Sequence, residues 1–141
     1  MPAVIRIDGD RIHLPAIIAQ CGLPFVEAIQ SQRSRRHNPN ETLSETTYNL
    51  TVSEASGDSV PHQIVDADSF LASNAESLRS IFKKVPRCKC TIDFSWDFPG
   101  DSIGQYNIFP SCFLSRLVEL QITLVLSVYG TTGRSESQNF I

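Results

Sequence analysis

The sequence has no long apolar run. No window holds the roughly 18 consecutive apolar residues that a membrane-spanning helix requires. The first residues carry Arg6, Asp8 and Asp10 and do not form the apolar stretch of a signal peptide. We therefore expect a cytoplasmic protein that has no membrane partner.

Cysteine is scarce, and its spacing is irregular. The four cysteines are too few for the disulfide framework of a secreted domain, and Cys88-x-Cys90 lacks the second pair or the spaced histidines of a zinc site. The histidines are scattered along the chain, at His13, His37 and His62. We expect free cysteines that pack in the core, no metal and no cofactor.

Signatures of catalysis are sparse as well. The sequence contains no H-E-x-x-H pair, and none of its cysteines stands in a recognisable nucleophile motif. Asp93 and Asp97 are four residues apart, which on a strand is roughly 13 Å and too far for a carboxylate dyad that acts on one bond. We expect no catalytic residue.

What is present indicates one soluble domain. With 141 residues, of which 41% are apolar and 19% charged, the chain is long enough to bury a single core without a disulfide or a metal. We place the domain at residues 1–130 and expect a polar tail at 131–141.

Charge is distributed unevenly along the chain, whose net charge is −3. Lysine and arginine are absent from residues 41–78, and a basic stretch follows at 79–90. An acidic surface suits a basic protein partner, whereas the basic loop at 33–37 lacks the interleaved aromatics of a nucleic-acid site. The candidate partner-binding residues are acidic: Glu41, Glu45, Glu54, Asp58, Asp66, Asp68, Glu76, Asp93 and Asp97.

The stretch at residues 88–98 organises the fold. Its apolar residues, Cys90, Ile92, Phe94, Trp96 and Phe98, alternate with polar ones, so an extended backbone turns one face inward and the other outward. The pattern predicts a half-buried strand whose aromatic face lies in the core.

The same reading places the other elements. Strands are predicted at 3–7, 46–52 and 122–129, with helices at 14–21, at 68–84 and after Pro110. Residues 25–30 suit a strand or a continuation of the preceding helix, and Gly22 and Pro24 favour the strand. Asp8-Gly9-Asp10 reads as a turn, 53–62 as a loop and 64–65 as a short extended piece, while 122–129 reads as a central strand covered on both faces. The order β-α-β-β-α-β-α-β predicts an α+β fold, a mostly antiparallel sheet with helices packed on one side.

The C-terminal half also carries a resemblance. Phe70-Leu71 and Ile81-Phe82 of the helix, Ile92-Asp93-Phe94 of the strand and Phe109-Pro110 with the apolar residues after it resemble a group of small bacterial domains. Several such domains occur as immunity proteins beside polymorphic toxins. The resemblance covers about residues 66–130, and Trp96 and the basic loop have no counterpart in it.

The resemblance implies a cytoplasmic protein that binds a cognate toxin and neutralises it by protein–protein contact, without catalysis of its own. It carries over no functional residue, because such proteins vary at the toxin-facing surface. The alternative is a small-molecule-binding or enzymatic domain with a pocket between helices and sheet, which would use His13, His62, Asp93 or Asp97. A homodimer remains open.

Overall fold

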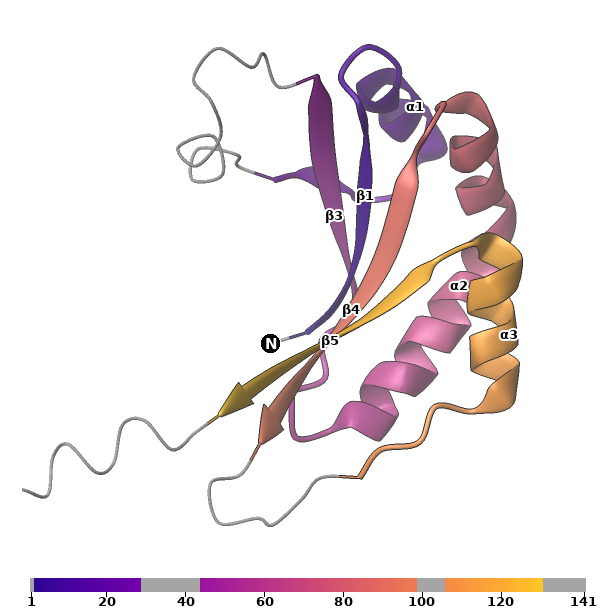
Figure 1. Cartoon of the computed structure of the whole chain (residues 1–141). Helices are drawn as coiled ribbons and strands as arrows, with labels where there is room; N and C mark the ends of the chain where they lie inside the picture. The colour runs from indigo at the N-terminus through magenta and orange to yellow at the C-terminus, as the bar shows by residue number, and fades with distance from the viewer. Residues whose placement is uncertain (1, 29–43, 99–105, 131–141) are drawn as a thin grey trace, which may run out of the picture.

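The computed structural model of the protein describes residues 2–28, 44–98 and 106–130. Within them lie the strands β1 (Ala3–Asp10), β2 (Val26–Glu27), β3 (Glu45–Ser53), β4 (Lys89–Phe98) and β5 (Thr123–Gly130), and the helices α1 (Leu14–Cys21), α2 (Val60–Lys84) and α3 (Ser111–Leu120). The strand order is β2-β3-β1-β4-β5, antiparallel throughout except for the parallel pair β4 and β5. The helices cover one face of the sheet (Figure 1), so the predicted α+β class is confirmed.

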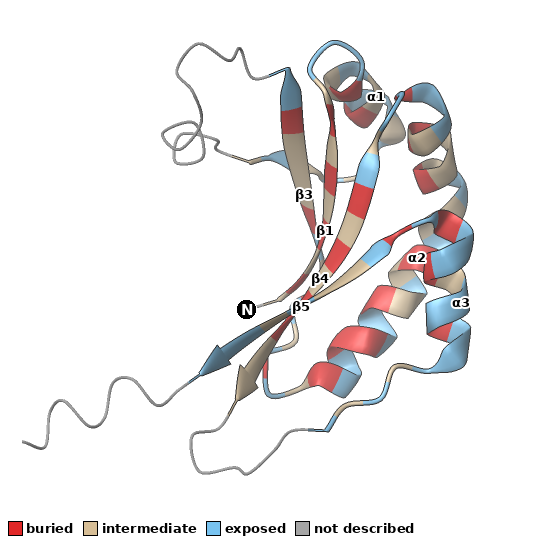
Figure 2. Ribbon diagram, viewed as in Figure 1, coloured by how far each residue is buried: buried red, intermediate tan, exposed pale blue. Residues whose placement is uncertain are grey.

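Strand β4 is the structural centre that its alternation predicts. Ile92 and Phe94 are fully buried on the helix side, where Phe94 meets the rings of Phe109 and Phe113 edge to face. The opposite face is polar, and there Asp93 accepts a hydrogen bond of 2.7 Å from the Ser127 hydroxyl of β5. The burial pattern alternates along β1 and β4 (Figure 2), as a sheet with one covered face requires.

Helix α2 begins eight residues earlier than the predicted start at residue 68, since it runs from Val60 to Lys84. The predicted loop at 53–62 is therefore wrong from residue 60 on, and the extended piece predicted at 64–65 is wrong because both residues are helical. Val60, Ile64, Ala67 and Leu71 recur at helical spacing and are all buried, and Pro61 stands in the first turn, where a proline costs little. Burial of this apolar face stabilises the helix more than the loop-forming residues at its start destabilise it.

Strand β1 also continues past its predicted end. The residues expected to form a turn, Asp8-Gly9-Asp10, pair with β3 as strand, and the turn follows at residues 11–13. A Cβ on Gly9 would stand 3.1 Å from Leu14 Cδ2 and 3.2 Å from Val85 Cγ1, so this glycine permits close packing on the strand. The carboxylate of Asp10 then closes the turn by accepting the backbone N–H of Ile12 and of His13.

Strand β5 is not the central strand that its apolar sequence predicts. It lies at the edge of the sheet and, within the described residues, pairs with β4 alone. Leu126 and Val128 remain 44% and 56% exposed, which a strand covered on both faces would not show. Burial within this chain therefore does not account for the whole apolar run of β5.

Strand β2 is shorter than predicted and pairs with β3 as expected. The basic loop at 33–37 and the polar tail at 131–141 lie outside the described residues. No helix in the described ranges has the length and apolar character needed to cross a membrane.

Candidate functional site: an acidic end of the domain

Four of the nine predicted acidic residues gather where β3 leads into α2 and where β4 ends. We call Glu54, Asp58, Asp66 and Asp97 the acidic end. Glu54 and Asp58 are exposed on the loop before α2, and Asp97 is the penultimate residue of β4. Residues 41–78 and 90–115 contain no lysine or arginine. The loop before α2, the first part of α2 and the end of β4 therefore contribute no lysine or arginine to this end.

A buried side chain holds the loop of the acidic end in place. Gln63 is fully buried, and its Nε2 donates to the carbonyl oxygens of Ala55 and Ser56 at 3.1 Å each and of Ser95 at 3.3 Å. One amide thus joins the loop to both α2 and β4. Since buried polar groups need their hydrogen bonds, the loop has one favoured position.

The loop also approaches the end of β4 closely. The Asp97 N–H donates to the Gly57 carbonyl at 3.2 Å, and a Cβ on Gly57 would stand 2.7 Å from Asp97 Oδ2. Only glycine leaves room for that carboxylate where it now lies. The contact keeps Asp97 beside the loop that carries Glu54 and Asp58.

Local hydrogen bonds hold two of these carboxylates, and one of them favours the charged form of Asp58. The Ser56 hydroxyl donates to Asp58 and lowers the pKa of that carboxyl below its ordinary value. Asp66 accepts a hydrogen bond of 2.7 Å from the Ser53 hydroxyl. The acidic end also surrounds the N-terminus of α2, whose dipole favours negative charge.

Exposed apolar side chains adjoin the acidic end. Tyr106 and Ile108 are 86% and 66% exposed on the segment that leads into α3. Between them and the core, Phe109 stacks on Trp96 with ring centroids 5.8 Å apart. Sequence reasoning treated this segment only as an irregular connection, although its aromatic residues in a stretch without cations were a usable signal.

The other predicted acidic residues are not part of this group. Asp68 pairs with Arg116 of α3 at 2.8 Å, and Glu76 pairs with Arg79 one turn along α2. Glu45 begins β3 at the opposite end of the domain, and Asp93 faces Ser127 on the open side of the sheet. Glu41 lies outside the described residues.

The opposite end of the domain carries four of the eight described lysine and arginine residues, together with the acids Asp10 and Glu45. Lys83 and Lys84 end α2, and Arg87 and Lys89 lead into β4. Because α2 has 25 residues, the path along it from the acidic end to this basic end is about 37 Å, with a kink at Asn74. The protein is therefore electrically polarised along α2 and β4.

Cys88 and Cys90 do not form a reactive site. Burial raises the pKa of the Cys88 thiol to about 11, with nearby Asp8 and Asp10 adding to the shift, and burial raises the pKa of Cys90 as well. Both sulfurs therefore stay protonated at neutral pH, whereas metal ligation and nucleophilic attack need the thiolate. The described residues contain no group of three or more His, Cys, Asp or Glu side chains placed to hold a metal.

A thiol reagent added at pH 8 is expected to modify Cys112 rapidly and Cys88 and Cys90 only when the protein unfolds. Cys112 is exposed on α3, whereas a thiol with a pKa of about 11 is about one part in a thousand thiolate at that pH. Colorimetric titration with and without denaturant measures this, with Cys112→Ser as the control that removes the fast phase. Rapid modification of Cys88 or Cys90 in the folded protein would contradict the assignment.

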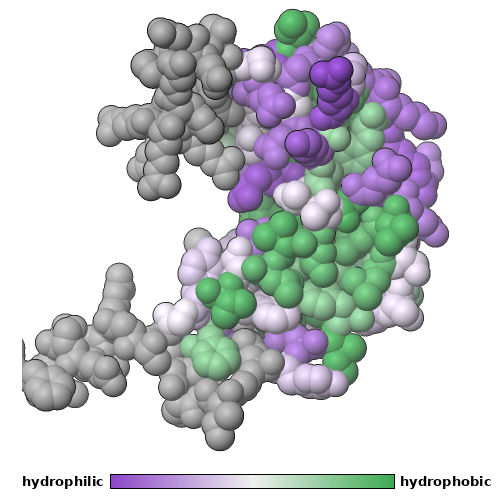
Figure 3. Space-filling model, in the orientation of Figure 1, coloured by the Kyte–Doolittle hydropathy of each residue, from purple (hydrophilic) through white to green (hydrophobic). Residues whose placement is uncertain are grey.

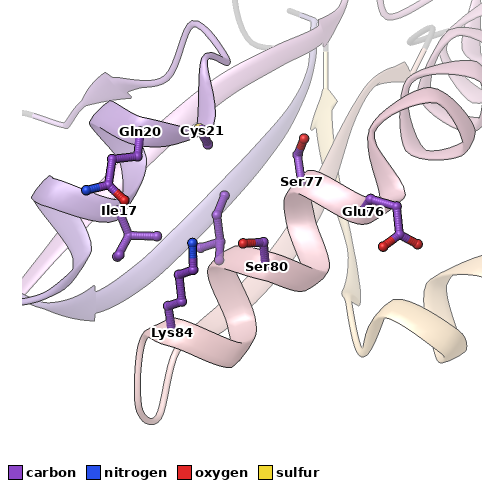
Figure 4. Close-up of a pocket in the computed structure, with 8 residues that line it drawn as sticks. Ile17, Gln20, Cys21, Glu76, Ser77, Ser80 and Lys84 are labelled. Atoms are coloured by element: carbon purple, nitrogen blue, oxygen red, sulfur yellow. The ribbon is translucent and has the colours of Figure 1, made fainter.

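The groups of the alternative, enzymatic reading are dispersed. His13 pairs with Asp10 at 2.9 Å beyond the end of β1, while His62 is exposed in the first turn of α2. A cavity of about 400 Å³ lies where the ends of α2 and α3 meet β4, and another of about 370 Å³ has His13 in its lining. A cavity of about 290 Å³ lies between α1 and α2 (Figure 4). Its lining, Ile17, Gln20, Cys21, Glu76, Ser77, Ser80, Ile81 and Lys84, includes none of the four residues named for that reading.

Residues 100–104 read G-x-S-x-G around Ser102, a nucleophile motif that was not among the sequence predictions. They lie outside the described residues. The catalytic form of this motif requires a strand, a sharp turn and then a helix at once, with the serine on the turn. In the described residues after the motif, 106–110 are non-helical and α3 begins at Ser111.

Comparison with models of protein families, with curated proteins and with solved structures finds no match to this chain. What defines the protein is therefore its own geometry: an α+β domain with an acidic end, a basic end and a sheet edge.

Proposed function

We propose that the protein is a bacterial immunity protein, which binds a toxin with a basic surface through the acidic end and neutralises it by protein–protein contact. The observation that carries the proposal is the gathering of Glu54, Asp58 and Asp97 at the end of the domain where Phe109, on the segment that carries exposed Tyr106 and Ile108, stacks on Trp96. Carboxylates speed the encounter with a basic partner, and a tyrosine supplies the type of side chain that dominates binding energy. The likeness of residues 66–130 to immunity domains supports the same reading.

The rigidity of the acidic end supports this proposal too. Gln63 and the Gly57–Asp97 contact hold the loop before a partner arrives, so less conformational entropy is lost on binding. In the described part of the chain the titratable groups are dispersed and the Cys88 and Cys90 thiols are protonated, which favours binding over catalysis.

The double substitution Glu54→Lys with Asp58→Lys is expected to weaken binding to the toxin by about a hundredfold, because two attractive charges become repulsive. Co-purification with the product of the neighbouring gene, followed by calorimetry at two salt concentrations, measures the effect. The matched control is Glu76→Lys with Glu119→Lys, which changes the net charge equally outside the acidic end.

The control pair should retain wild-type affinity and still rescue cells that express the toxin, whereas the first pair should not. Equal losses in both pairs would show an effect of net charge alone and contradict the assignment to the acidic end. Absence of both complex and rescue with the wild-type protein would overturn the proposed function.

A further inference from the structure

We propose that two copies of the protein associate through β5 and α3, with the two β5 strands antiparallel and related by a two-fold axis. The surface that carries this proposal consists of Leu114 and Val118 of α3 and Leu126 and Val128 of β5, and we call it the edge surface. These side chains are 40%, 77%, 44% and 56% exposed, respectively. It is distinct from the acidic end, so this inference does not rest on the proposed function.

The four side chains form one surface because of the packing beneath them. Leu126 and Val128 stand in register with Phe94 and Trp96, which places them on the helix side of the sheet. Leu114 and Val118 are one helical turn apart and follow the buried Phe113 and Leu117.

The edge surface is continuous. Phe113 contacts Phe94 with ring centroids 5.9 Å apart, so α3 packs over β4 next to β5. The space-filling view shows one hydrophobic area over the part of the molecule where α3 and β5 lie (Figure 3).

The edge itself carries none of the features that keep strands from pairing. Residues 123–130 contain no charged residue and no proline, and β5 has no irregularity in its register with β4. In the part of the chain that the structure describes, the other side of β5 has no strand beside it. Such an edge is a template for another strand, and a strand of the same sequence brings no charge into the contact.

Charge complementarity selects a second copy in the antiparallel arrangement. β5 runs from the basic end, beside Lys89, to the acidic end, where Tyr129 pairs with Asp97. Antiparallel pairing therefore sets Asp97 of each copy at the end of the contact where Lys89 of the other copy lies, which is favourable at both ends of the contact. A parallel arrangement would place like charges together.

The size of the contact suits a dimer of moderate affinity. Eight strand residues extend about 26 Å, and the strand and helix layers together are about 20 Å thick. This gives on the order of 500 Å² per copy and 1,000 Å² for both, near the lower limit of specific interfaces. We therefore expect a dissociation constant in the micromolar range. Glu54 and Asp58 follow β3, three strands from the contact in the sheet order, so the dimer leaves them accessible.

Analytical ultracentrifugation of the full chain, from micromolar to sub-millimolar concentration, tests the proposal. The wild type is expected to shift from monomer to dimer, and Val118→Lys with Val128→Lys is expected to weaken the dimer by about a hundredfold. The matched control is Ile12→Lys with Val26→Lys, which adds the same charges at exposed apolar positions elsewhere, Val26 being on the opposite edge strand. Thermal unfolding of each variant confirms that it is folded.

A wild type that remains monomeric over the whole range overturns the proposal and leaves the edge surface to a different protein. A dimer that survives the Val118 and Val128 substitutions, or that the control pair weakens equally, also overturns it. Neither result bears on toxin binding, which the Glu54 and Asp58 variants test separately.

Discussion

Replacing Phe94 with alanine is expected to lower the free energy of unfolding by about 4 kcal/mol. Phe94 is fully buried in the centre of β4, and its ring meets Phe109 at 5.4 Å and Phe113 at 5.9 Å, both edge to face. The substitution removes these ring contacts and leaves a cavity between β4 and α3 that rigid neighbours cannot fill. The cost combines lost burial with lost dispersion contacts.

Denaturant unfolding followed by the fluorescence of Trp96, the single tryptophan, measures this loss. Phe94→Leu keeps much of the volume and is expected to cost about 1 kcal/mol, which keeps the test informative if the alanine variant does not fold. Ile12→Ala serves as the control, because Ile12 is 83% exposed and its truncation should change stability by less than about 0.5 kcal/mol. A loss under 1 kcal/mol for Phe94→Ala would contradict the central role of β4.

Replacing Gln63 with leucine is expected to cost about 2 kcal/mol, although the two side chains have similar volumes. Leucine cannot donate to the carbonyls of Ala55, Ser56 and Ser95, and buried acceptors that lose their donor are costly. The loop of the acidic end then loses its link to β4. We expect toxin binding to weaken as well, because the loop must be ordered during binding.

Hydrogen exchange separates this local effect from general destabilisation. The Asp97 amide, which donates to Gly57, should exchange faster in the Gln63→Leu variant than the amides at the centre of β4. Gln20→Leu is the control, since Gln20 is exposed on α1. Unchanged stability together with unchanged exchange at Asp97 would show that Gln63 does not hold the loop.

Much of the architecture could be predicted from local patterns. The alternation from Cys90 to Phe98 predicted a strand with one buried face, and the fold class followed from the order of the elements. The start of α2 was misplaced because the serine, glycine and proline residues before it resemble a loop. The buried series from Val60 to Leu71 outweighs them only when the sheet is present to cover it.

The acidic character of the candidate site could be predicted from the sequence, but the residues that form it could not. A chain segment without lysine or arginine indicated an acidic surface, and the structure brings Glu54, Asp58, Asp66 and Asp97 together. Asp68 was counted with them, yet it pairs with Arg116, which lies 48 residues away in the sequence. Such a pairing depends on how α3 packs against α2, and a local sequence pattern does not predict contacts between residues so far apart in the chain.

The sequence by itself determined which residues face the core of each element and how charge is distributed along the chain, because both depend on side-chain type and on periods of two or 3.6 residues. Only the tertiary structure decided the order of the strands. An apolar run such as residues 122–129 suits a covered central strand and an exposed edge equally well, since its local preferences are the same in both. Long-range pairing placed it beside β4 at the edge, so residues predicted to lie in the core, such as Leu126 and Val128, are exposed.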